Sequence, residues 1–230
     1  MNRRRLAFGL ASLLAFAIAA VALLIGTGNL CVTSTARPEG DSARTVPARA
    51  DAGDADGDGI DDQTDILEGA LAYVATRPRY RSAYYAEGWP DDGCGVCTDV
   101  VARGLLAAGY DLKTLMAADI EHDPEAYGIA EPDPAIDFRR VRNQQVFFER
   151  HAQALTTDVY DRDAWEPGDI AVLPEHVGIV SDRCDANGIP YLIHHEGPWQ
   201  RAYEEDVLAR RANEVIGHYR VAGGLRLPAS

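Results

Sequence analysis

One cysteine and two histidines of this chain have the types and the spacing of a nucleophile, its base and a group that orients the base. Cys97 opens an apolar segment with helical spacing, directly after a glycine-rich turn at residues 91–95. The positive end of a helix dipole favours the thiolate, the reactive form of cysteine. His176 begins the segment His-Val-Gly-Ile-Val, and His194 ends the segment Tyr-Leu-Ile-His. A thiol nucleophile needs a base within hydrogen-bond reach and the base needs an orienting partner, so these residues predict a Cys–His–His hydrolase.

Two other hypotheses fit the same residues. A buried structural thiol and two histidines satisfied within the core would have the same spacing as a catalytic set. Cys94-Gly-Val-Cys97 is also a C-x-x-C at the start of a helix, which is typical of thiol–disulfide oxidoreductases. In those proteins the first cysteine usually attacks, which would make Cys94 the reactive residue. The sequence has no early βαβ pattern, and this disfavours the redox hypothesis.

Periodicity predicts helices in the first half of the chain and strands in the second. The predicted helices are Ile66–Ala75 with Asp65 as N-cap, Cys97–Ala108, a short helix from Asp111 through Met116, and Asn143–Ala152. The predicted strands are Ile170–Leu173, His176–Ser181, Pro190–His194 and Val215–Val221. Helices followed by strands indicate an α+β domain with an antiparallel sheet. A short turn joins the two strands that carry the histidines, so we expect His176 and His194 to lie close together.

The N-terminus predicts export. Arg3, Arg4 and Arg5 precede an uncharged, apolar run over residues 6–25. A basic flank before such a run is typical of an export signal, and about 20 residues also suffice to span a bilayer as a helix. Residues 1–27 are therefore either a signal anchor or a cleaved signal peptide, and the long run favours the anchor. We expect the rest of the chain on the extracytoplasmic face of the membrane or in the periplasm.

The charge of the chain excludes one class of partner. Its formal net charge is −14, and Lys and Arg are not clustered. Proteins that bind nucleic acid neutralise phosphates with clustered basic residues, so nucleic acid is not an expected partner.

Residues 28–65 have the composition of an acidic, flexible linker with a calcium-loop pattern inside it. Carboxylates alternate around glycine at Asp54, Asp56 and Asp58, and Asp65 follows. Such a pattern suits calcium, because Ca²⁺ takes many oxygen ligands and glycine allows the sharp turn of the loop. The run also resembles the acidic repeats of thrombospondin type 3 modules. It departs from an EF-hand because Ile60 stands one place early and the last ligand is Asp. A solvated acidic linker and a structural calcium site both fit this run of residues. The predicted hydrolase requires no other cofactor.

Five further residues are candidates for substrate binding. Tyr84 and Tyr85 precede the cysteine turn and either line a cleft or belong to the core. Asp99, two residues into the predicted helix, has the position of a cap or of a partner for Arg139 or Arg140. A guanidinium fork could instead hold a substrate carboxylate. A structural ion pair is the commoner arrangement.

Several motifs resemble one bacterial family, the domain of unknown function 1287, over about residues 66–221. They are Gly-Val-Cys97-Thr-Asp-Val-Val, Asp-Phe-Arg139-Arg140-Val-Arg-Asn, Trp-Glu-Pro-Gly-Asp169-Ile, His176-Val-Gly-Ile-Val-Ser-Asp and Leu-Ile-His194, in this order. That family is similar to the NlpC-type cell-wall peptidases of the papain-like clan. The resemblance implies a papain-like fold over residues 66–223, with helices packed on the sheet and a tail at 224–230.

The resemblance also implies a function. The NlpC pattern has a cysteine opening a helix, a histidine before Val-Gly-Ile and a polar residue closing the next strand, which fall on Cys97, His176 and His194. An amidase or endopeptidase acting on peptidoglycan stem peptides is the implied activity, and a non-catalytic module that binds the cell wall is an alternative. Two departures concern the substrate: the sequence around the cysteine is Val96-Cys97-Thr98, and an insert over residues 118–142 has no NlpC counterpart.

Overall fold

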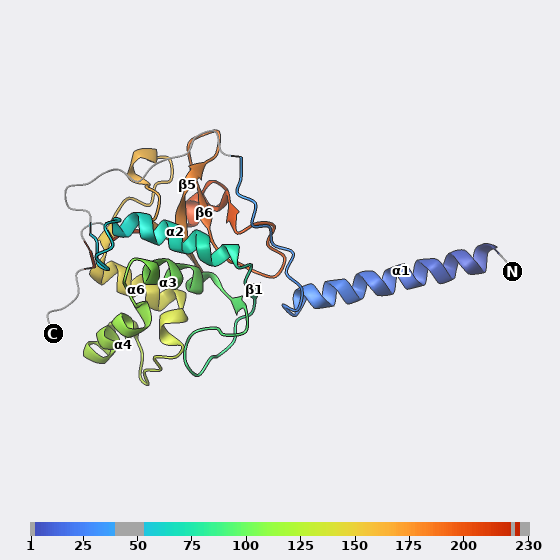
Figure 1. Ribbon diagram of the computed structural model, residues 1–230, viewed down its shortest axis with the longest axis horizontal. Helices are drawn as coiled ribbons and strands as arrows, with labels where there is room; N and C mark the ends of the chain where they lie inside the picture. The colour runs from blue at the N-terminus through green and yellow to red at the C-terminus, as the bar shows by residue number, and fades with distance from the viewer. Residues whose placement is uncertain (1–2, 40–52, 222–223, 226–230) are drawn as a thin grey trace.

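The structure, a computed structural model, describes residues 3–39, 53–221 and 224–225. Helix α1 (Arg3–Gly26) projects away from the rest of the molecule (Figure 1). Within the described residues, no helix combines the length and the apolar character that are needed to cross a membrane. The predicted membrane anchor over residues 6–25 is therefore not confirmed. Part of the predicted linker, residues 40–52, and the end of the predicted tail, residues 226–230, lie outside the described residues.

A six-stranded antiparallel sheet forms the centre of the domain, which confirms the α+β prediction. Its order is β3-β8-β4-β5-β6-β7. Alternate residues of β4 enter two separate apolar clusters, Ile170 and Val172 on one face and Ala171 and Leu173 on the other, so the sheet is covered on both sides. The strands are β3 (Gln153–Ala154), β4 (Ile170–Leu173), β5 (His176–Cys184), β6 (Pro190–Ile193), β7 (Glu204–Glu205) and β8 (Gly217–Arg220).

Helices cover one face of this sheet, and a short helix covers the other. The longer helices are α2 (Asp62–Ala75), α3 (Cys97–Ala107), α4 (Leu112–His122) and α6 (Val141–His151), with short α5 (Pro124–Tyr127) and α7 (Val207–Arg210). Two-residue strands β1 (Arg79–Tyr80) and β2 (Cys94–Gly95) pair in parallel. Short 3-10 turns lie at Asp137–Arg139, Arg162–Ala164 and Ala212–Glu214.

Helices α2 and α3 pack side by side (Figure 1), and glycines allow their close approach. A Cβ added to Gly104 would lie 2.8 Å from the carbonyl oxygen of Ile66, and one added to Gly69 would lie 2.4 Å from the Cβ of Ala107. Contacts this short are not tolerated, so side chains at these two positions would force the helices apart. The pair positions Cys97, which opens α3.

Two predicted helices differ from the structure by more than two residues at one end. Helix α2 begins at Asp62 rather than Ile66, because Asp61 and not Asp65 is the N-cap: its carboxylate accepts the N–H of Thr64 at 3.0 Å. Helix α4 has the predicted cap, Asp111, but continues to His122. The buried Ile120 continues the apolar face of this helix, but the polar residues between Met116 and His122 hide the helical periodicity in the sequence.

The N-terminal part of the predicted flexible linker lies against the domain. The thiol of Cys31 lies 3.3 Å from the hydroxyl of Tyr203, and the backbone of Ser34 bridges that of Ala202. Arg37 forms ion pairs with Glu204 and Asp182. The composition predicts a linker because the segment has few core residues. In the structure, backbone bridging and ion pairs hold the segment on the domain.

The Trp-Glu-Pro-Gly-Asp motif belongs to a buried charge network. Asp169 is fully buried at the start of β4 and accepts hydrogen bonds from Arg220, His218 and Gln63 at 2.6–2.9 Å. Trp165 stacks on His218 with 3.7 Å between ring centroids. Because these residues come from α2, β4 and β8, the motif joins the helical layer to the sheet.

Candidate active site

Cys97 is the first residue of α3, and its neighbours explain why the helix begins there. Val96 before it is extended, with φ −139° and ψ −178°, and the carboxylate of Asp99 accepts the Val96 N–H at 2.8 Å. This bond satisfies one of the N–H groups left free at a helix start. Val100 and Leu105 are fully buried and hold the helix on the core. The predicted position of Cys97 at a helix start is what the structure shows.

Burial dominates the electrostatics of this thiol. Cys97 is only 8% exposed, and burial raises its pKa to about 11, although the N–H groups of Val177 and Thr98 favour the thiolate. The expected stabilisation of a thiolate by the helix dipole is therefore outweighed in the resting structure. At neutral pH the group is a thiol.

His176 and His194 face each other, as the strand arrangement predicts. The Nε2 atom of His176 lies 3.0 Å from Nδ1 of His194, and the ring planes are 84° apart. Both residues are buried, with exposures of 4% and 0%. Burial, followed by the proximity of His194, lowers the pKa of His176 to about 3, so this imidazole is neutral at physiological pH.

The second nitrogen of His176 remains available. Its Nδ1 atom has no hydrogen-bond partner among the described residues, and it is not among the fully enclosed polar atoms. No hydrogen bond joins it to the Cys97 sulfur in the described structure. That sulfur instead takes the backbone N–H of Val177, the residue next to His176. Cys97 and His176, the predicted nucleophile and base, thus lie at adjoining ends of α3 and β5. A separation without a hydrogen bond is common in active sites that hold no substrate.

Glu205 and Gln200 extend the histidine pair, and sequence reasoning missed both. Glu205 Oε2 lies 3.8 Å from His194 Nε2, and Gln200 Nε2 lies 3.2 Å from it. Burial would raise the pKa of Glu205, but the interaction with His194 and the N–H of Ala202 outweigh it and lower the pKa below its usual value. Glu205 is therefore a carboxylate beside His194. Strand β7 has two residues and gives no periodic signal that would have placed it.

Cys97 lines a cleft of about 560 Å³. Two aromatic residues that sequence reasoning missed, Tyr80 and Tyr127, line it, whereas Tyr84 and Tyr85 do not. Burial and the nearby Cys97 raise the pKa of Tyr80. Tyr84 is 61% exposed on the surface, and the hydroxyl of Tyr85 donates to Asp92. The insert at 118–142 supplies much of the wall, including Tyr127, Ile129, Glu131, Asp137, Arg139 and Arg140.

The two predicted arginines have different environments. Arg139 makes a double hydrogen bond to the buried carboxylate of Asp99, at 2.7 and 3.0 Å, and a third bond to the carbonyl of Ala83. It is a structural ion pair beneath the cleft. The side chain of Arg140 is 60% exposed, and its nearest carboxylate is Asp137 at 3.7 Å. Arg140 is the one of the two with donors free for a ligand.

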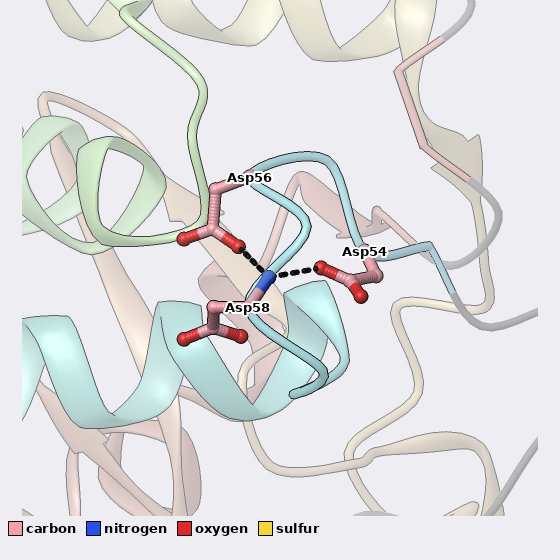
Figure 2. Close-up of side chains that lie close together, drawn as sticks. All are labelled: Asp54, Asp56 and Asp58. Atoms are coloured by element: carbon pink, nitrogen blue, oxygen red, sulfur yellow. Dashed lines mark hydrogen bonds between the residues drawn. The ribbon is translucent and has the colours of Figure 1, made fainter.

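The remaining candidates lie elsewhere. The four cysteines, Cys31, Cys94, Cys97 and Cys184, all lie within the described residues and form no disulfide bond. The carboxylates of Asp54, Asp56 and Asp58 converge in the loop before α2 (Figure 2), remote in sequence from the cleft residues. Asp65 lies within α2 and is buried.

Comparison with known proteins identifies the family. The model of the family described as Domain of unknown function (DUF1287) matches residues 67–221. The chain is 34% identical to the uncharacterized protein YijF of Escherichia coli (strain K12) over 168 residues, which cover 67% of this chain and 80% of that protein. No solved structure matches. Cys97, His176, His194 and Glu205 all lie within the matched region, and the chain belongs to the DUF1287 family.

Proposed function

We propose that this protein is an exported cysteine hydrolase, an amidase or endopeptidase of NlpC-like, papain-like type. One observation carries the proposal: the paired imidazoles of His176 and His194 lie beside the thiol at the start of α3, and one nitrogen of the neutral His176 has no hydrogen-bond partner among the described residues. A purely structural histidine pair has no need of a free nitrogen beside a cleft that contains a cysteine.

The steps follow from these positions. Nδ1 of His176 takes the thiol proton as the Cys97 sulfur attacks an amide carbonyl carbon. The C–N bond then breaks, the departing amine receives the proton from His176, and a thioester remains on Cys97. Water, deprotonated by His176, attacks the thioester and releases the acid and the thiol. The backbone N–H of Cys97, at the positive end of α3, is suited to stabilise the oxyanion.

The resting protonation states are compatible with this chemistry. In the resting structure Cys97 is a neutral thiol and His176 is a neutral imidazole. Proton transfer creates both charges at once, and each then stabilises the other. The carboxylate of Glu205, 3.8 Å from Nε2 of His194, offsets part of the positive charge on the histidine pair. We therefore expect the ion pair to form only transiently, as the thiol attacks a substrate bound in the cleft.

One arginine of the cleft is suited to a substrate carboxylate. Acidic and basic side chains both line the cleft, and among them Arg140 has exposed donors. Stem peptides of peptidoglycan carry free carboxylates beside their amide bonds, so they suit a guanidinium next to a nucleophile. The arginines at residues 3–5 and the apolar helix α1 support export to the compartment that contains this polymer.

Digestion of purified peptidoglycan tests the proposal. The full chain, its Cys97→Ala variant and its Cys94→Ser variant would each be incubated with the polymer, and the released fragments weighed by mass spectrometry. We expect the wild type and Cys94→Ser to release the same fragments and Cys97→Ala to release none. Full hydrolysis by Cys97→Ala would sink the proposal. Loss of activity in Cys94→Ser together with disulfide-reducing activity in the wild type would favour an oxidoreductase instead.

A further inference from the structure

We propose that the loop before α2 is a calcium site, with Asp54, Asp56, Asp58 and Asp65 as its carboxylate ligands. The site is independent of the hydrolase function, and it lies outside the region that the family model matches. The four residues stand at positions 1, 3, 5 and 12 of a twelve-residue loop, the spacing at which calcium loops place carboxylates, and Gly59 stands at position 6.

The first observation is the convergence of three carboxylates. One oxygen from each of Asp54, Asp56 and Asp58 lies within 4.8 Å of the others, and all three residues are exposed. Figure 2 shows the three side chains grouped around the backbone N–H of Asp58, which donates to Asp54 and Asp56 at 3.1 and 3.2 Å. The N–H groups of Gly57 and Gly59 also donate to Asp54. The loop thus holds three negative groups together in a fixed shape.

The second observation is independent of the loop and concerns Asp65. This residue is 8% exposed, and its Oδ2 atom is fully enclosed without a hydrogen-bond partner. Burying a carboxylate oxygen unpaired is costly, so such an atom indicates a missing ligand or a proton. The charges of Asp58 and Asp56 act on this carboxylate more strongly than that of Asp61, the N-cap of α2, so Asp65 lies within reach of the exposed cluster.

A divalent cation resolves both problems. It neutralises the repulsion among four carboxylates, and it provides a partner for the enclosed oxygen of Asp65. Ca²⁺ suits this donor set better than Mg²⁺, because it accepts six to eight oxygens in flexible geometry, whereas Mg²⁺ retains its waters. The last ligand is Asp rather than Glu and the loop is single, so we expect an affinity of about 10⁻⁴–10⁻³ M, typical of extracellular modules.

The contacts of the loop indicate what calcium would do. Asp62 accepts the N–H of Ala55 at 2.8 Å with one oxygen and the hydroxyl of Tyr110 at 2.6 Å with the other. A Cβ added to Gly109, in the turn that ends α3, would meet the Cβ of Asp56 at 3.1 Å. The loop therefore joins the start of α2 to the end of α3. Calcium would fix the helix pair that carries Cys97 without taking part in its chemistry.

Binding and thermal unfolding of the full chain test this inference. After removal of divalent ions, CaCl₂ titration followed by calorimetry should show saturable binding. At 10 mM CaCl₂ the melting temperature should rise by roughly 5 °C over that in EDTA, and less in MgCl₂. Asp58→Asn, an exposed change, should weaken calcium binding at least about tenfold. Asp163→Asn, an exposed acid outside the loop, should bind as the wild type does.

The Asp65→Asn variant tests whether Asp65 is a calcium ligand or only a carboxylate that repels its neighbours. It should melt at a higher temperature than the wild type in EDTA, because it removes a buried negative charge, yet gain nothing from calcium. The absence of both binding heat and a melting shift at 10 mM CaCl₂ would overturn the site. So would equal weakening by Asp58→Asn and Asp163→Asn, since that result indicates diffuse attraction to an acidic chain.

Discussion

The Nε2 atom of His176 and the Nδ1 atom of His194 are 3.0 Å apart, so a single proton lies between them. If His176 is to accept a thiol proton at Nδ1, its Nε2 must already carry the shared proton. His194 then has an unprotonated Nδ1 and carries its own proton on Nε2, the nitrogen that faces Glu205. The carboxylate of Glu205 favours this tautomer, whereas the amide N–H of Gln200, near the same nitrogen, favours the other. In the proposed hydrolase we therefore expect Glu205 to act as a positioning residue for His176.

Replacement of Glu205 by Gln should lower kcat/KM for amide hydrolysis about tenfold or more, because the reversed tautomer places a proton on Nδ1 of His176. Nitrogen-15 NMR of the imidazoles should show the switch directly, without any substrate. Glu214→Gln, an exposed change near α7, should alter neither quantity. An unchanged tautomer with lost activity would show that Glu205 acts through folding, and an unchanged tautomer with full activity would dismiss its role.

The alkylation rate of Cys97 in the free protein should increase about tenfold for each pH unit from 7 to 10. The reason is that burial raises its pKa to about 11, so the thiolate fraction grows over this whole range. Mass spectrometry after iodoacetamide pulses would follow the peptide that contains Cys97, with Cys31 as an internal reference. A plateau below pH 8 would instead indicate a preformed thiolate–imidazolium pair.

Stability should decrease on acidification, because two histidines are buried in neutral form. Burial, followed by His194, lowers the pKa of His176 to about 3 and that of His195 to about 4, whereas unfolded histidine titrates near 6.5. The unfolded state therefore binds more protons below pH 6.5, and the stability present above that pH is lost towards the folded pKa values. The expected loss is about 2 kcal/mol for each histidine between pH 7 and 5.

Urea unfolding at several pH values would measure this loss. His195→Phe should make the pH dependence about half as steep, since the ring of His195 only packs between Tyr80 and Tyr203 and its Nδ1 has no partner. His122→Gln, at an exposed position, should leave the slope as it is. If His195→Phe left the slope unchanged, His195 would not be a source of the pH dependence of stability.

Asp99→Asn should destabilise the domain by about 3–5 kcal/mol, because it leaves the buried guanidinium of Arg139 without its countercharge. The asparagine can still accept the N–H of Val96, so loss of the helix cap does not explain the effect. Adding Arg139→Gln should restore part of the stability in urea unfolding. Arg140→Gln, next to the pair but exposed, should change stability by less than about 0.5 kcal/mol. Equal losses in Asp99→Asn and Arg140→Gln would refute the distinction between the two arginines.

The same Arg140→Gln variant should raise KM about tenfold for peptides with a free carboxylate beside the scissile amide, and leave kcat unchanged. An exposed guanidinium that lines the cleft has donors for such a group. Amidated peptides should show no difference between variant and wild type. Arg201→Gln provides the control outside the cleft; a similar effect from it would mean that only overall charge matters.

Local signals explain how much of the site the sequence could predict. Cys97 opens a helix with an apolar face, and His176 and His194 mark ends of adjacent strands, so periodicity alone placed all three. Glu205 and Tyr80 lie in two-residue strands whose partners are distant in sequence, and no local pattern identifies them. The helix start predicts a dipole that favours the thiolate of Cys97, whereas burial raises its pKa to about 11, because burial depends on the whole fold and the helix dipole is a local property.

The ion pair of Asp99 and Arg139 has a consequence for how this domain can change over evolution. Asp99 stands two residues after Cys97, while Arg139 comes from the insert that forms the cleft wall. An insertion or deletion that displaced the arginine would leave the buried charge of Asp99 unpaired two residues from Cys97. We therefore expect the insert and helix α3 to be inherited as one unit, and a homologue that has lost either charge should have replaced both.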